Sequence, residues 1–148
     1  MKVTLKRATV MDAKTLVAFE RKVANPKLYG QPLDGEAAIQ EINQNSFYFI
    51  KRGSEIVGTA AVRRSEKDTV YISNVAVLPE FRRQGIARSA MLSLLKRSNG
   101  ATRIELATHP ENKAALELYS SLGFVVESRK ENYFGDGEPR LILSLHKN

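Results

Sequence analysis

The chain has 148 residues, of which 43% are hydrophobic and 26% are charged, and it contains no cysteine. This composition predicts a folded domain and excludes a disordered chain, disulfides, thiolate metal sites and a thiol nucleophile. The 23 Lys and Arg against 16 Asp and Glu give a net charge of +7. That excess favours anionic partners in general: phosphates, nucleic acid, an acidic protein or a membrane surface.

The pattern of apolar residues predicts the element order β-α-α-β-β-β-α-β-α-β-β. Strands are expected at residues 3–8, 46–51, 55–62, 70–78, 103–108, 124–133 and 140–146. Helices are expected after the capping pattern at residues 9–12, at 36–43, from the glycine turn near 85 to about 98, and at 111–122. Residues 25–35, rich in Pro and Gly, are expected to be an irregular loop and a candidate substrate lip.

This order predicts an α/β (α+β) fold, with a mixed sheet and helices on both faces. No repeat or Pro/Gly/Ser-rich linker divides the sequence, so residues 1–148 are expected to form a single domain. MKVTLKRATV lacks the apolar run of a signal peptide, and no segment reaches the ~20 apolar residues of a membrane span. We therefore expect a cytoplasmic protein without a membrane partner.

The stretch PEFRRQGIARSAM, residues 79–91, carries the strongest functional pattern. A helix start leaves backbone N–H groups without partners and carries partial positive charge, and Arg82, Arg83 and Arg88 add formal charge there. Gly85 lets a phosphate approach the backbone, and Ala87 keeps the next inward position small. The pattern suits a pyrophosphate, although a turn glycine beside solvated arginines is an equally simple interpretation. It matches neither the Walker motif nor the three-glycine dinucleotide fingerprint.

Together with HPENKAALELYSSLGF downstream, NVAVLPEFRRQGIARSAM resembles the Gcn5-related N-acetyltransferase (GNAT) family. Arg82, Gly85 and Ala87 match the family's acetyl-coenzyme A signature, and the likeness covers nearly the whole chain in element order. The resemblance implies a twisted, mostly antiparallel mixed sheet of about seven strands. It also implies transfer of acetyl from acetyl-CoA, a co-substrate, to a primary amine by direct attack in a ternary complex, without a metal.

By this resemblance, pyrophosphate would bind the backbone N–H groups between Arg83 and Arg88, supplemented by the Arg82 and Arg88 side chains. The preceding strand would pair its free backbone with the pantetheine arm and the acetyl carbonyl, and one N–H would polarise the thioester. The implied cofactor-binding residues are Val75, Ala76, Val77, Arg82, Arg83, Gln84, Gly85, Ile86, Ala87, Arg88, Asn112 and Tyr119.

Asn112 and Tyr119 are seven residues apart, so on one helix they would share a face about 10 Å apart along the axis. In the family this Asn binds the pantetheine region, and the Tyr hydroxyl protonates the leaving thiolate. Tyr119 is therefore the expected catalytic residue. The alternative is a core aromatic in ALELYSSLGF, and the two roles are compatible because a packed ring can present its hydroxyl to a site.

The sequence departs from the family where a general base would stand. The strand before the phosphate loop offers only Tyr71 and Ser73, and the position five residues before Asn112 is Ala107. Glu105 and His109 share the face of Ala107 and remain candidates, each accepting the amine proton through water. Family members without a positioned base release this proton to water alone.

The acceptor is less defined. RKENYFGDGEPRLILSL is similar to the last hairpin of bacterial ribosomal-protein N-terminal acetyltransferases, which places Tyr133 and Phe134 where that group contacts the peptide. The acidic residue usual after the turn is absent, and Pro139 and Arg140 stand there. A protein N-terminus, a lysine or a small amine all remain open, as does a monomer or a homodimer. Acidic residues that could instead receive a polyamine or aminoglycoside are Glu36, Glu41, Asp136 and Glu138.

Two rival functions are compatible with parts of the sequence. A catalytically silent acetyl-CoA-binding module would explain the missing base, although Tyr119 favours an enzyme. A nucleic-acid-binding domain would explain the positive charge. The sequence lacks aromatic residues interleaved with basic ones, however, so nucleic acid is a less favoured partner.

Overall fold

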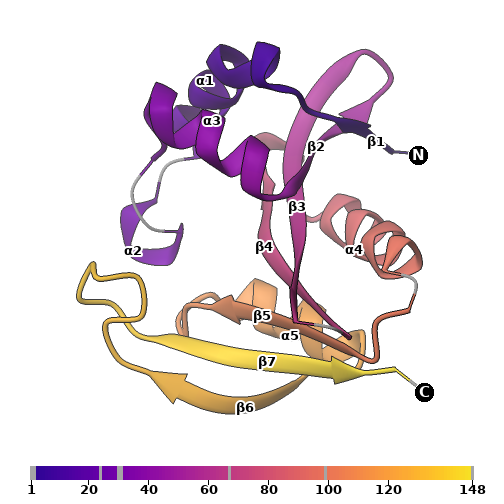
Figure 1. Ribbon diagram of the computed structural model, residues 1–148, viewed down its shortest axis with the longest axis vertical. Helices are drawn as coiled ribbons and strands as arrows, with labels where there is room; N and C mark the ends of the chain where they lie inside the picture. The colour runs from indigo at the N-terminus through magenta and orange to yellow at the C-terminus, as the bar shows by residue number, and fades with distance from the viewer. Residues whose placement is uncertain (1–2, 24, 30–31, 67, 99, 148) are drawn as a thin grey trace. The chain divides into compact units, whose positions relative to one another are not determined.

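The computed structural model describes residues 3–23, 25–29, 32–66, 68–98 and 100–147 (Figure 1). Their strands form a seven-stranded sheet in the order β1-β2-β3-β4-β5-β7-β6, which confirms the predicted fold class. The backbone forms two compact units. The first holds the described residues of 3–23, 32–63 and 72–98, and the second holds those of 25–29, 64–71 and 100–147.

The first unit contains most elements of the N-terminal half of the chain. Its strands are β1 (Thr4–Arg7), β2 (Ser46–Arg52), most of β3 (Glu55–Glu66) and the second part of β4 (Thr69–Val77). Its helices are α1 (Ala13–Val23), α3 (Gly35–Gln44) and α4 (Ile86–Arg97), with short 3-10 turns η1 (Val10–Asp12) and η2 (Pro79–Phe81). β2 pairs antiparallel with both β1 and β3.

Two predicted caps start the first helices. Thr9 and Asp12 form the expected capping box, and the Asp12 carboxylate accepts the Thr9 N–H at 2.9 Å. The Asp34 carboxylate accepts the Ala37 N–H at 2.8 Å and begins α3. These bonds satisfy backbone donors that have no partner inside a helix, so both starts are determined locally by sequence.

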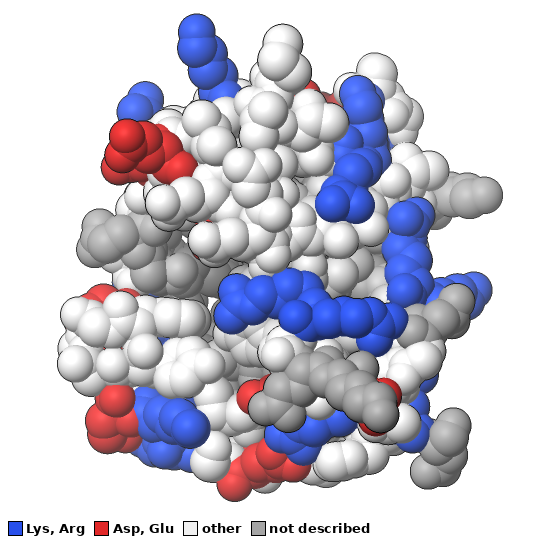
Figure 2. Space-filling model, in the orientation of Figure 1, with Lys and Arg blue, Asp and Glu red and all other residues white. Residues whose placement is uncertain are grey.

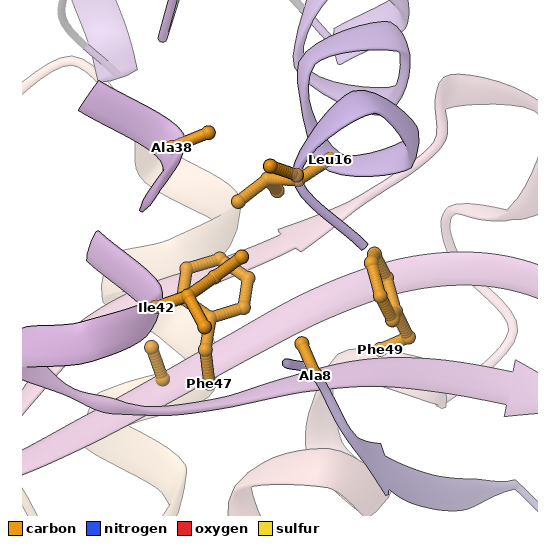
Figure 3. Packing of buried hydrophobic residues seen from close by; sticks show 8 residues of the cluster. Ala8, Leu16, Ala38, Ile42, Phe47 and Phe49 are labelled. Atoms are coloured by element: carbon orange, nitrogen blue, oxygen red, sulfur yellow. The ribbon is translucent and has the colours of Figure 1, made fainter. Parts of the chain in front are cut away.

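The core of the first unit lies between β2 and the helices α1 and α3. Phe47 and Phe49 extend from one face of β2 into a cluster with Leu16 and Ile42, as Figure 3 shows. Tyr48 points to the opposite face, where its ring lies 5.2 Å from the Arg97 guanidinium of α4. Because side chains alternate along a strand, this arrangement places helices against both faces of β2, as predicted.

The second unit contains α2 (Pro26–Tyr29), the start of β4, β5 (Arg103–Thr108), α5 (Lys113–Ser121), β6 (Val125–Lys130) and β7 (Arg140–His146). β7 pairs antiparallel with β5 on one side and with β6 on the other. The Arg103 guanidinium donates to Glu127 on β6 at 2.9 Å, and Ser144 on β7 donates to the same carboxylate at 2.7 Å. These hydrogen bonds, that from Arg103 above all, lower the pKa of Glu127 to about 2.

The structure corrects several predicted boundaries. Residues 26–29 form the short helix α2, although proline and glycine had predicted an irregular loop; Pro26 stands first, where its missing N–H costs nothing. Gly30 and Gln31 lie outside the described residues. β3 continues beyond the predicted end to Glu66. α5 begins at Lys113 because Asn112 caps it, and β6 ends at Lys130 because residues 131–139 form the turn before β7.

Candidate functional site

The turn before α4 has the backbone geometry of an anion site. Arg83 has φ +64° and Gly85 has φ +78°, so two residues of the turn adopt the left-handed conformation that is typical of anion-binding backbone turns. The first bond of the helical ladder joins the Ser89 N–H to the Gly85 carbonyl at 3.0 Å. The N–H groups of Ile86 and Ala87 precede that bond, and no side chain caps the helix at Gly85.

Space beside Gly85 is open, as a phosphate requires. A Cβ built on Gly85 would meet no heavy atom within 4 Å in the described part of the chain. The Arg82, Arg83 and Arg88 side chains are exposed around it. Figure 2 shows more Lys and Arg than Asp and Glu side chains on the face that it presents. Open access, main-chain donors and positive charge thus coincide at one turn.

Side-chain contacts hold this turn in place. The Arg52 guanidinium on β2 donates to the Gln84 Oε1 at 2.9 Å and lies 4.6 Å from the centre of the Phe81 ring. The Arg82 Nε donates to the Val77 carbonyl at 3.1 Å, so it ties the turn to the end of β4. Arg82 and Gln84 were both predicted to bind the cofactor. In the structure, the Arg82 Nε and the Gln84 Oε1 form hydrogen bonds within the protein.

The end of β4 leads directly into the turn. Val75 and Ala76 are half-buried and Val77 is buried, so their side chains belong to the packing, as expected. Ser73, the weak base candidate on this strand, donates its hydroxyl to the Asn45 Oδ1 at 3.0 Å and is committed to that bond.

Gly58 on β3 allows a close approach to β4. A Cβ at this position would lie 2.4 Å from the Ala76 carbonyl oxygen. Because that neighbour is backbone, we expect Gly58→Ala to displace β4 and to lower the free energy of unfolding by about 1–3 kcal/mol, the usual cost of overpacking. Thermal unfolding measures the loss, and acetyl-CoA titration measures any displacement of the predicted pantetheine strand.

Gly35→Ala is the matched control for this substitution. Gly35 starts α3, and a Cβ there meets nothing within 4 Å. Alanine should leave the melting temperature unchanged or raise it slightly. Equal melting temperatures for Gly58→Ala and the wild type would contradict the close-approach argument.

Asn112 and Tyr119 lie in the second unit, and the turn before α4 lies in the first. Asn112 is the N-cap of α5, and its Oδ1 accepts the Ala115 N–H at 3.3 Å. Its backbone (φ −83°, ψ 75°) is not helical, so the prediction that both residues lie on one helix holds only for Tyr119. Asn112 therefore has a local structural role, and its cofactor contact stays a prediction.

Tyr119 lies buried in the packing of α5. Its ring centre lies 6.0 Å from that of Phe124. Burial, with a smaller contribution from Tyr29, raises its pKa to about 12. The hydroxyl is therefore protonated at neutral pH, so the core packing and a role as general acid are compatible.

The two predicted base candidates both have partners. The Glu105 carboxylate accepts from the Arg103 Nε at 3.2 Å, and the Arg103 guanidinium also binds Glu127. His109 is buried; its Nδ1 accepts the Glu111 N–H at 3.0 Å, and its Nε2 lies 2.7 Å from Glu138 Oε1. Both ring nitrogens of His109 are therefore engaged, and the Glu105 carboxylate is paired with Arg103 through its Oε2.

The turn between β6 and β7, residues 131–139, presents the predicted acceptor aromatics. Tyr133 and Phe134 contact each other edge to face, with ring centres 4.9 Å apart, and Phe134 is exposed. The buried Arg140 guanidinium lies 4.9 Å from the Phe134 ring and 3.5 Å from the Asp136 carboxylate. Arg140, which stands with Pro139 in place of the usual acidic residue, is thus a buried side chain against which the exposed Phe134 ring packs.

Sequence reasoning did not identify the part that α2 plays in the second unit. Lys27 forms an ion pair with Glu111 at 2.8 Å, and Tyr29 contributes to the pKa of Tyr119. The predicted substrate lip therefore borders α5. Only its Pro and Gly content marked this loop in the sequence, because partners so distant in sequence leave no local pattern.

The chemistry of the donor set fits a diphosphate such as that of acetyl-CoA. Its diphosphate would find main-chain donors at Ile86 and Ala87, open space at Gly85 and exposed arginines beside them. No group of three or more His, Cys, Asp or Glu that could hold a metal ion occurs among the described residues. None of the helices in the described ranges is both long enough and apolar enough to cross a membrane.

The family model of the acetyltransferase (GNAT) family matches residues 16–124. The chain is 36% identical to N-alpha-acetyltransferase 30 of Schizosaccharomyces pombe over 53% of each chain. It is 32% identical to the [ribosomal protein bS18]-alanine N-acetyltransferase of Escherichia coli, over 57% of this chain and 61% of the relative. The match thus spans about half to three fifths of these relatives.

Among solved structures, a GNAT family acetyltransferase from Elizabethkingia anophelis with acetyl-CoA bound has a TM-score of 0.76. The match covers 98% of both chains at 21% sequence identity. This likeness shows that the two chains share a fold.

Proposed function

The chain belongs to the acetyltransferase (GNAT) family, and from this premise we propose that it transfers acetyl from acetyl-CoA to a primary amine. The observation that carries the proposal is the turn before α4, with its two left-handed residues, uncapped helix start and open glycine. The acetyl-CoA complex of the similar Elizabethkingia protein supports the choice of co-substrate.

In this function the turn before α4 binds the diphosphate. The N–H groups of Ile86 and Ala87 donate to phosphate oxygens, and exposed Arg83 and Arg88 add positive charge. Arg82 keeps the turn in register with β4 through its bond to Val77. Backbone groups of Val75, Ala76 and Val77 pair with the pantetheine arm, and one N–H polarises the thioester carbonyl.

The chemical step is direct attack of the neutral amine on the thioester carbonyl. The new C–N bond forms, the C–S bond breaks, the amine loses one proton, and the departing sulfur gains one. Tyr119, which is protonated at neutral pH, supplies the proton to sulfur and then regains one from water. The amine proton passes to water, because Glu105 and His109 both have partners.

For the acceptor we propose the amino terminus of a protein chain. The names of the yeast and E. coli relatives support this choice, as do the aromatics at the turn between β6 and β7. Exposed Phe134 offers an apolar surface for a peptide side chain, and buried Arg140 supports it.

Two measurements test the function. Thermal unfolding with acetyl-CoA tests binding, and thiol release with hexapeptides that differ only in their first residue tests turnover. We expect a higher melting temperature and thiol release with at least one free N-terminus, but none with the same peptide acetylated. Stabilisation without thiol release from peptides, lysine or polyamines would identify a silent binding module. No association with acetyl-CoA at low ionic strength would refute the proposal.

A further inference from the structure

His109 links two parts of the second unit that lie far apart in sequence. It precedes α5, and its side chain, only 1% exposed, reaches Glu138 in the turn between β6 and β7. Such complete burial of an imidazole requires a partner for each ring nitrogen. Both nitrogens have one, so the residue has a defined role even though the proposed reaction does not use it.

The hydrogen bonds determine where the ring carries its proton. Nδ1 accepts the Glu111 N–H at 3.0 Å and therefore holds no proton. The proton of the neutral ring is then on Nε2, which donates to Glu138 Oε1 at 2.7 Å. This bond joins a buried donor to a carboxylate, which is the stronger kind of hydrogen bond.

Glu138 is itself held firmly by the turn. Its N–H donates to the Asp136 Oδ1 at 2.9 Å, and its carbonyl accepts the Tyr133 N–H at 3.3 Å. A continuous path of hydrogen bonds therefore runs from the start of α5 through His109 and Glu138 to Tyr133. Tyr133 is one of the two aromatic residues, with Phe134, that the proposed function places beside the peptide.

We propose that His109 is a positioning residue for the acceptor: its bond to Glu138 sets the turn that carries Tyr133 against the start of α5. The inference rests on the proposed function, since it assigns the turn to the acceptor. Loss of the bond frees the turn and weakens acceptor binding, whereas acetyl-CoA binding stays as it is because its predicted diphosphate donors lie on α4.

The test compares substitutions that keep or remove this bond. In His109→Asn the amide oxygen can still accept the Glu111 N–H, but the asparagine side chain is too short to reach Glu138. Glu138→Ala removes the carboxylate that accepts the Nε2–H hydrogen bond. Glu138→Gln keeps an oxygen that can accept this bond and removes only the charge. Glu131→Ala is the matched control, because Glu131 is an exposed glutamate of the same turn that pairs with Arg129.

The probe is the hexapeptide that the wild type acetylates fastest. We expect His109→Asn and Glu138→Ala each to raise its KM about tenfold, the effect of losing one hydrogen bond to a charged group. Their kcat and acetyl-CoA affinity should stay within about twofold, and the double variant should resemble either single one. Glu131→Ala should resemble the wild type, and Glu138→Gln, which keeps a weaker neutral hydrogen bond, should fall between the wild type and Glu138→Ala. An unchanged KM in His109→Asn, or a Glu138→Gln as impaired as Glu138→Ala, would overturn the inference.

A measurement without turnover separates this inference from the proposed function. Nitrogen NMR of the wild type should show His109 protonated at Nε2 alone. Amide exchange at Tyr133 should quicken in His109→Asn and Glu138→Ala, and less in Glu138→Gln. If these results are obtained but no peptide is acetylated, the proposed peptide substrate is refuted and the role of the His109–Glu138 hydrogen bond in holding the turn stands. A proton on Nδ1 of His109, or amide exchange at Tyr133 that is unchanged in the two variants, would refute the positioning role of His109 even if the protein is an active acetyltransferase.

Discussion

Gly85→Glu should abolish acetyl-CoA binding, with affinity lowered at least a hundredfold. The new carboxylate would stand at the open position beside the uncapped start of α4, where the proposed function places a diphosphate. Two like charges about 4 Å apart repel by about 4 kcal/mol near a protein surface, which is more than a hundredfold in affinity. Isothermal titration with acetyl-CoA measures the effect.

Two controls separate charge from backbone strain. Gly85→Ala imposes the same left-handed strain without charge, and it should retain most of the affinity because nothing lies within 4 Å of its new Cβ. Gly53→Glu places a glutamate at another left-handed, uncrowded glycine, in the turn between β2 and β3, and should bind normally. If Gly85→Glu bound acetyl-CoA as tightly as Gly53→Glu, the diphosphate would not sit at this turn.

Tyr119→Phe should lower kcat by roughly a hundredfold, the lower range for loss of a general acid. The phenylalanine ring keeps the packing against Phe124, so acetyl-CoA affinity and melting temperature should change little. Steady-state kinetics with a reactive hexapeptide, together with acetyl-CoA titration, measures both. Tyr29→Phe removes a nearby exposed hydroxyl and should reduce kcat far less. Normal turnover in Tyr119→Phe would exclude the general-acid role.

The pKa of Tyr119 gives this assignment a pH dependence. An α-amino group has a pKa of about 8, so turnover of a peptide should rise with pH through that value as the neutral amine forms. Because the pKa of Tyr119 is about 12, its proton should remain and the plateau should persist beyond pH 10. A decline centred near pH 10 would indicate an ordinary tyrosine. The protein should also lose stability between pH 10 and 12, since the folded state holds this proton more tightly than the unfolded one.

Several features of this protein follow from nearby residues alone. The capping box at Thr9 and the cap at Asp34 start their helices through bonds between residues three apart. The left-handed Gly85 at the start of α4 likewise depends on its missing side chain. Periodicity and turn residues therefore predicted most helices and strands, as well as the candidate anion site.

Other features of the protein depend on partners that are distant in sequence. The loop of residues 25–35 includes a helix whose Lys27 pairs with Glu111, and Glu105 is bound by an arginine that also reaches Glu127 on β6. His109, one of the base candidates in the sequence, is bonded through Nε2 to Glu138, 29 positions away.

The sequence by itself determined the fold class, the capped helix starts at Thr9 and Asp34 and the left-handed turn at Gly85, because each depends on backbone preferences and side-chain spacing within a few residues. Only the tertiary structure decided which side chains have partners: it buried Tyr119 and raised its pKa, tied Arg82 to Val77, and joined His109 to Glu138. Burial and hydrogen bonding depend on what distant segments bring to a residue, and these determine whether a titratable group can act.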